Sequence, residues 1–154
     1  MSVKAVASDK MLEIFEILFG DNINIKPVTN HVSADQSLMA ARYVIDDDSV
    51  CGWILADPMF AAAAGGALTL IPPDVVKEAH QKQTLEGMLL ENFGEIMNIC
   101  SSVIQSKVER HVRLDRAEKP GDFSDIADVD QSSRSSFEVQ FPRYGKGIVT
   151  VAIA

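Results

Sequence analysis

The sequence predicts an α/β (α+β) domain in which an antiparallel β-sheet packs against long α-helices. Two apolar runs, Ala40 to Ile45 and Val50 to Leu55, are joined by a short polar turn, as in a β-hairpin. A longer segment, from about Thr84 to Lys107, repeats its apolar residues at helical spacing. The strands and helices do not alternate in the regular βαβ order of a parallel sheet, and this favours an antiparallel one.

Length and composition predict one domain over residues 1–154. Of the 154 residues, 47% are hydrophobic, which is enough for one core and too little for two independent ones. The 14 basic and 22 acidic residues give a net charge of -8, which opposes nonspecific attraction to nucleic acid or anionic lipid. The first ten residues have no apolar signal region, and no apolar run is long enough for a membrane span. We expect a cytoplasmic protein without nucleic-acid or membrane partners.

The cysteines and histidines predict no metal or nucleophile site. Cys51 and Cys100 lie in apolar contexts without CxxC spacing, so two reduced, buried thiols are expected rather than a zinc site or a disulfide. His31, His80 and His111 are far apart in the sequence and form no HExxH motif, and no serine stands in a GxSxG context.

Two short motifs are excluded by their missing residues. Asp128 and Asp130 suggest a calcium loop, but the Gly and Glu that such a loop needs are replaced by Ser133 and Val139. The pair Gly65–Gly66 lacks the glycine spacing and the lysine of a phosphate-binding loop. Neither calcium nor nucleotide binding is predicted.

The first part of the chain predicts a helix followed by a strand. Ser8 is expected to cap the helix and Gly20 to end it, because the apolar residues between them form one stripe. The segment Ile23 to Val28 then alternates as a strand does.

After the hairpin, the sequence predicts an alanine-rich helix. Asp57 is expected to cap it and Pro58 to take its first position. The helix is expected to run to Gly65–Gly66, and Pro72–Pro73 to close this region.

The expected long helix from Thr84 to Lys107 has one broad apolar face and one polar face. The polar residues step by four, three, four and three positions, so they lie along one side: Glu91, Glu95, Asn98, Ser102 and Gln105. Further strands are expected at Val112 to Leu114, Phe137 to Phe141 and Ile148 to Ile153. The Asp- and Ser-rich segment from Gly121 to Ser136 is expected to be a flexible loop.

The segment Glu91 to Ile99 resembles the signature helix of the CheC/CheX chemotaxis phosphatases. In that family a Glu is followed three residues later by an Asn, as Glu95 and Asn98 are here, and Glu91 takes an earlier polar position. Pro120 lies one residue short of the spacing at which the family has a proline. The order of elements is also similar over nearly the whole chain. The first helix has Glu13 and Glu16 without a matching Asn, so the chain is closest to the single-motif CheX type.

The resemblance implies a phosphatase that removes the aspartyl phosphate of a phosphorylated, CheY-like response regulator in chemotaxis signalling. It implies catalytic roles for Glu95 and Asn98, with Glu91, Gly94 and Ser102 binding the partner. Asn98 would position water, and Glu95 would pair with a lysine of the receiver domain. Mg²⁺ is expected on the receiver, and no cofactor or metal on this chain. A homodimer is also implied.

Several other interpretations stay open. Residues Ile99 to Ser102 replace the small residues that follow the motif in the family, which motivates a noncatalytic adaptor that binds a receiver or a flagellar-switch protein. A solvated helix face would have the same polar periodicity. A ligand-sensing pocket under Ala61 to Ala67 is a further possibility. Gly94 within the helix points either to close approach of another backbone or to tight packing inside the domain.

Overall fold

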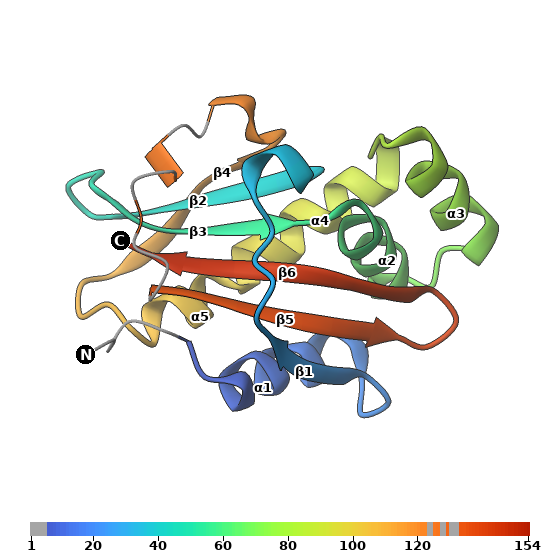
Figure 1. The fold of residues 1–154 in the computed structure, drawn as a ribbon, viewed down its shortest axis with the longest axis horizontal. Helices are drawn as coiled ribbons and strands as arrows, with labels where there is room; N and C mark the ends of the chain where they lie inside the picture. Colours follow the sequence, from blue (N-terminus) through green and yellow to red (C-terminus); the bar gives the residue numbers. More distant parts are fainter. Residues whose placement is uncertain (1–5, 123–124, 127–128, 130–132) are drawn as a thin grey trace.

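The computed structural model describes residues 6–122, 125–126, 129 and 133–154, and its centre is a six-stranded antiparallel sheet (Figure 1). The strand order is β1-β5-β6-β3-β2-β4. The strands are β1 (Asn24–Val28), β2 (Met39–Ile45), β3 (Val50–Ala56), β4 (Val112–Glu118), β5 (Arg134–Phe141) and β6 (Gly145–Ile153). The antiparallel α+β prediction is confirmed.

The predicted hairpin is present: β2 pairs with β3 so that Ala40 lies opposite Leu55. The last two strands, β5 and β6, form a second hairpin. β5 begins at Arg134, so the last part of the expected flexible loop belongs to the sheet instead, where Ser136 lies opposite Thr150. The residues Asp128 and Asp130 of the rejected calcium motif lie outside the described residues.

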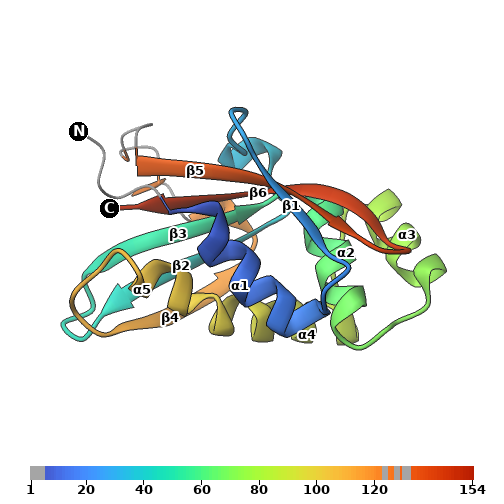
Figure 2. The same cartoon turned by 90° about the horizontal axis from the view of Figure 1, so that it is seen from below.

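The helices are α1 (Ser8–Phe19), α2 (Pro58–Leu68), α3 (Pro73–Lys82), α4 (Gly87–Ile99) and α5 (Ser101–Gln105). Figure 2 shows α1, α4 and α5 along one face of the sheet. The main core lies between this layer and the strands, where the ring of Phe60 contacts those of Phe15 and Phe141. Within the described part of the chain, no helix is both long and apolar enough to cross a membrane.

The opposite face of the sheet is covered by the segment that connects β1 to β2. This crossing segment, residues 29–38, passes over the strands in Figure 1 and includes a short 3-10 helix, Ala34–Gln36. Val32 and Ile126 pack there against Trp53 in a second, smaller apolar cluster. Because both faces are covered, the central strands are buried on both sides.

The predicted start of α1 is one residue off. Ser8 is already the first helical residue, and Ala7 precedes it without a capping side chain. The N–H of the buried Val6 donates to the Ser135 hydroxyl at 3.0 Å, so a tertiary contact defines where the helix begins. The predicted end is confirmed: Gly20 follows with φ 91°, a conformation that favours glycine.

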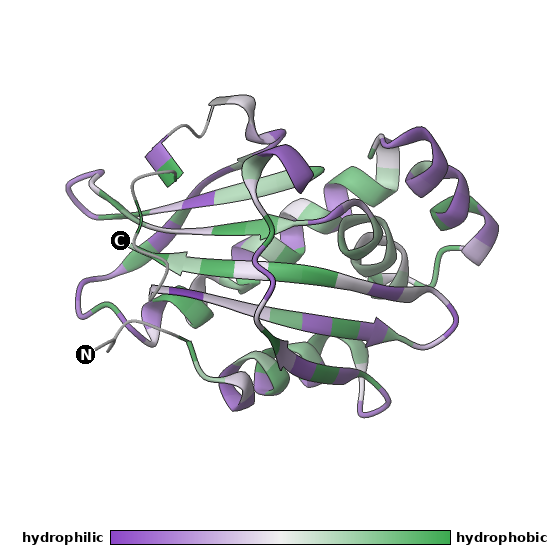
Figure 3. Ribbon diagram, viewed as in Figure 1, coloured by the Kyte–Doolittle hydropathy of each residue, from purple (hydrophilic) through white to green (hydrophobic). Residues whose placement is uncertain are grey.

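Helix α3 was not predicted from the sequence. Pro72 and Pro73 precede and begin a helix rather than closing the region, which fits the preference of proline for the first helical turn. Only Val76 and Ala79 of this helix are buried, so few apolar residues mark it in the sequence. Figure 3 shows α3 as mainly hydrophilic, beside the more apolar α2.

The predicted single helix from Thr84 to Lys107 is wrong, because the structure has two. Residues 84–86 are not helical, and α4 begins at Gly87, whose φ of 59° favours glycine. The break at Cys100 precedes two serines, and the Ser102 hydroxyl donates to the Ile99 carbonyl at 3.0 Å. Such local bonds compete with the regular helical ladder.

Candidate functional site

Helix α4 is held against α2 by a close backbone contact and a buried amide. A Cβ added at Gly65 would lie 2.8 Å from the Leu89 carbonyl oxygen, so glycine allows the two helices to approach this closely. The Asn92 amide donates to the Gly65 carbonyl at 2.8 Å and to the Thr69 hydroxyl at 2.9 Å. These contacts fix which face of α4 is turned toward the core.

The sheet supplies a second anchor for α4. The Tyr43 hydroxyl of β2 donates to the Met97 carbonyl at 2.6 Å, and Tyr43 is fully buried. Burial, with a smaller contribution from Cys100, raises the pKa of Tyr43 well above its ordinary value, so the hydroxyl keeps its proton and remains a donor. Phe93 and Ile96 lie beneath the helix in the main core.

This anchoring leaves Glu91, Glu95 and Asn98 exposed together on the outer face of α4. Within the described part of the chain, these three side chains form no hydrogen bond or ion pair. The structure therefore brings the two predicted catalytic residues together, one helical turn apart, with their polar groups available to a partner.

Gly94 lies on the same helix, and the space beside its Cα is open. A Cβ added there would meet nothing within 4 Å among the described residues outside its own turn. The interpretation that Gly94 serves tight packing inside the domain is therefore wrong. A glycine in a helix interior costs about 1 kcal/mol relative to alanine, and close approach by another molecule at Gly94 stays a prediction.

Ser102 is separated from the other predicted site residues. It lies on α5 beyond the break at Cys100, is half-buried, and uses its hydroxyl on the Ile99 carbonyl. Cys100 itself is fully buried, and burial raises its pKa to about 12. Cys51 is also a free, buried cysteine, so the prediction of two buried thiols is confirmed.

Pro120 follows β4 and begins a short 3-10 helix, Pro120–Asp122. The interpretation of a ligand pocket under Ala61 to Ala67 is not supported. Ala61 to Ala64 are fully buried, and a nearby hollow is lined from α3 and the start of α4 instead. Among the described residues, no group of three or more His, Cys, Asp and Glu side chains could hold a metal ion.

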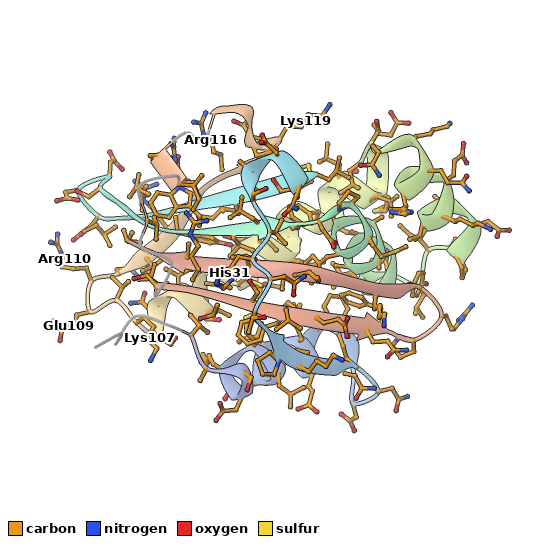
Figure 4. The ribbon with its side chains drawn as sticks, viewed as in Figure 1. His31, Lys107, Glu109, Arg110, Arg116 and Lys119 are labelled. Carbon is orange, nitrogen blue, oxygen red and sulfur yellow. The ribbon has the colours of Figure 1, made fainter. Side chains whose placement is uncertain are left out.

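His31 makes a partly buried contact with the sheet, remote from this site. In Figure 4, His31 lies over the middle of the sheet, on the crossing segment. Its Nδ1 lies 2.5 Å from the Ser136 hydroxyl, which in turn bonds Thr150 at 2.7 Å. Burial, then the charge of Arg134, lowers the pKa of His31.

Sequence reasoning missed the residues that set the orientation of α4, among them Asn92 and Gly65. Asn92 stands at a position of the apolar stripe, and a polar residue there is a signal for a buried hydrogen bond. Gly65 follows four alanines, and such small residues allow close helix packing. What they contact could not be inferred, because their partners are far away in the sequence.

Comparisons with known proteins find similarity at the level of structure. No protein-family model and no curated protein matches the sequence. The chain is similar to the FliM middle domain from H. pylori, with a TM-score of 0.55 and 11% identity over 96% of this chain and 93% of that one. It is similar to a chain of the CheX–CheY–BeF3–Mg²⁺ complex from Borrelia burgdorferi, with a TM-score of 0.54 and 12% identity over 94% and 93%.

A chemotactic CheC-like protein from Shewanella oneidensis is also similar, with a TM-score of 0.53 and 10% identity over 95% of this chain and 94% of that one. Identities this low inform on fold, and fold alone does not determine activity. The similarity extends over nearly the whole chain, so this chain has the CheC/CheX-like fold.

Proposed function

We propose that this protein hydrolyses the aspartyl phosphate of a phosphorylated CheY-like response regulator, using Glu95 and Asn98 on helix α4. The observation that carries the proposal is the geometry of this pair. Both side chains are exposed, one turn apart, without partners in the described part of the chain, on a helix anchored by Asn92 and Tyr43. A rigid helix can present both groups in a constant geometry.

For this reaction, the main task of this chain is to position a water molecule. A receiver domain supplies its own Mg²⁺ and lysine, so the missing element is a water molecule held in line with the phosphorus. The Asn98 carboxamide can accept and donate hydrogen bonds, and because it is neutral it does not repel the phosphoryl oxygens. We assign to Asn98 the positioning of that water.

Glu95 has a different role in the proposal. A carboxylate is unsuited to approach the phosphoryl group, but it can pair with a lysine of the receiver. Glu95 and Asn98 are three residues apart on one helix. An ion pair at Glu95 would therefore fix the position of α4 on the receiver so that Asn98 lies at the phosphoryl group. Glu91 and Gly94 extend the same contact surface toward the start of the helix.

The choice of partner has support from one neighbour. The B. burgdorferi structure contains CheX together with CheY, BeF3 and Mg²⁺, and beryllium trifluoride imitates a phosphoryl group on a carboxylate. We carry this pairing over as part of the proposal, with Mg²⁺ bound by the receiver. The homodimer that the family resemblance implies belongs to the proposal as well.

A second candidate is an adaptor that binds a receiver or flagellar-switch protein without hydrolysis. Two observations favour it: α4 ends at Ile99, directly after Asn98, and the FliM middle domain has the same fold. An adaptor would use the exposed face of α4 for binding and would leave the lifetime of the phosphoryl group unchanged.

The decay of phosphorylated receiver domains tests both candidates. A panel of the host's receivers is phosphorylated, and the loss of phosphate is followed with wild-type protein, with Asn98→Ala and without addition. The proposal expects faster decay with wild type and the unassisted rate with Asn98→Ala. Unchanged decay of every receiver that binds would leave the adaptor as the function.

A further inference from the structure

A groove opens at the start of the same helix, between α3 and α4. Its volume is about 500 Å³, and its apolar lining comes from Ile71, Val75, Ala79, Met88 and Leu89. This α3–α4 groove was not predicted from the sequence, because α3 was not. It is large enough to receive an apolar side chain from another molecule.

Two of the apolar side chains at the groove are unusually open to solvent. Val75 is 44% exposed and Met88 is 56% exposed. Single exposed apolar residues are common on protein surfaces, but two that flank one hollow indicate a contact surface. Methionine adds to this, because its flexible side chain adapts to different partners.

The groove is continuous with the proposed catalytic face. Met88 lies one helical turn before Glu91, and Glu95 follows one turn later, so the three side chains lie in a row along α4. A molecule that covers Glu95 and Asn98 can therefore reach the groove from the same side. One partner could therefore contact both places without any rearrangement of the domain.

The negative charge around the groove favours a partner with basic residues. Glu78 and Lys82 line the groove and pair with each other at 2.6 Å, so their charges offset. Glu86 adds a negative charge at the groove, and Glu91 and Glu95 extend an acidic row along α4. A complementary surface would have a large apolar side chain with lysine or arginine beside it.

We propose that the α3–α4 groove is a second docking site for the receiver domain, filled by an apolar side chain that a basic residue flanks. This inference rests on the function proposed above and adds the feature that determines which receiver is bound. Residues Val75 and Met88 make the contact, at a distance along the helix from the atoms that would position water. The groove therefore contributes to affinity and not to the chemical step.

The substitution Val75→Glu tests the groove, and Ile17→Glu on α1 is its matched control. Both place one negative charge at an exposed apolar position of a helix, since Ile17 is 76% exposed. Glutamate has a higher helix propensity than valine or isoleucine, so both variants should fold, which circular dichroism checks. The affinity for receivers loaded with beryllium trifluoride is measured, together with the dephosphorylation rate at saturating receiver.

The inference expects Val75→Glu to weaken binding about tenfold or more, because its carboxylate would lose hydration against the apolar side chain of the partner. The saturated rate should stay within about twofold of wild type. Ile17→Glu should bind as wild type does. If wild type hydrolyses a receiver and Val75→Glu binds it normally, the groove inference is overturned and the proposed function stands. Equal weakening by both variants would indicate a general charge effect and overturn it too.

The same measurements separate a failure of the proposed function. If wild type binds a receiver without speeding the loss of its phosphate, the proposed hydrolysis is wrong. The affinity of Val75→Glu for that receiver then still tests whether the groove is a docking site. If wild type binds no receiver of the host's panel, both the proposed function and the groove inference are removed.

Discussion

At the scale of single residues, Glu95 and Asn98 have separable tasks. Substituting Asn98 by Ala should abolish hydrolysis while leaving the affinity for the receiver unchanged, because the amide acts on water. Substituting Glu95 by Gln should weaken binding, because the ion pair is lost. Both variants should change the free energy of unfolding by less than about 0.5 kcal/mol, since both positions are exposed.

Receiver titrations with each variant measure the affinity and the saturated rate separately. Glu109→Gln, the same change at another exposed glutamate, is the control. Normal hydrolysis by Asn98→Ala, or a lost fold, would show that the assignment of Asn98 to water is wrong.

Two helical glycines should respond in opposite directions to substitution by alanine. Gly94→Ala should raise the free energy of unfolding by about 1 kcal/mol, because the added methyl meets open space and alanine favours the helix. Gly65→Ala should lower it by about 1–3 kcal/mol, because the methyl would press on the Leu89 carbonyl.

Urea unfolding of the two variants beside wild type measures both changes. If Gly94→Ala is also destabilising, Gly94 has a packing role in the domain after all. If it is stabilising and weakens receiver binding, the glycine serves the approach of the partner.

At the scale of elements, α4 depends on its contact with α2. Asn92→Ala should destabilise the fold by about 1–3 kcal/mol, because a buried amide that bonds both Gly65 and Thr69 is removed. Asn98→Ala is the matched control, since it removes the same side chain from the exposed face of the same helix. Equal stabilities of the two variants in urea would show that Asn92 does not anchor α4.

The arrangement of α2, α3 and α4 also explains the conspicuous glycines after the alanine run. Gly66 approaches Val76 of α3, as Gly65 approaches Leu89 of α4, so α2 is packed between both helices. The sequence excluded these glycines from phosphate binding, and the structure supplies their role in close helix packing.

At the scale of the whole molecule, His31 connects the crossing segment to the sheet and should make stability depend on pH. Its lowered pKa means that the folded state resists protonation of the imidazole. As the pH falls through about 6.5, the unfolded chain takes up this proton first, so the stability present above that pH decreases.

Urea unfolding at pH 7.5 and 5.5 should show this decrease in wild type and a smaller decrease in His31→Gln. His111→Gln, at an exposed histidine, controls for the removal of an imidazole. The same pH dependence in wild type and His31→Gln would contradict the expected role of His31.

Much of the fold could be predicted because its elements are encoded locally. The polar turn between Ile45 and Val50 predicts the β2–β3 hairpin, and Asp57 caps α2 by accepting from the Phe60 N–H at 2.8 Å. Such signals act over a few residues. Helix α3 was missed because it is short and buries only two residues. The break at Cys100 was missed because a serine that bonds the carbonyl three residues earlier leaves the apolar spacing of the sequence unchanged.

The sequence by itself determined the antiparallel sheet class, the polar stripe with Glu95 and Asn98, and the acidic surface. Periodicity and charge are properties of neighbouring residues. Only the tertiary structure decided that this stripe faces outward, since that depends on Gly65, Asn92 and Tyr43 meeting α4 from distant parts of the chain. It also created the α3–α4 groove, because a hollow between two helices exists only once both are packed against α2.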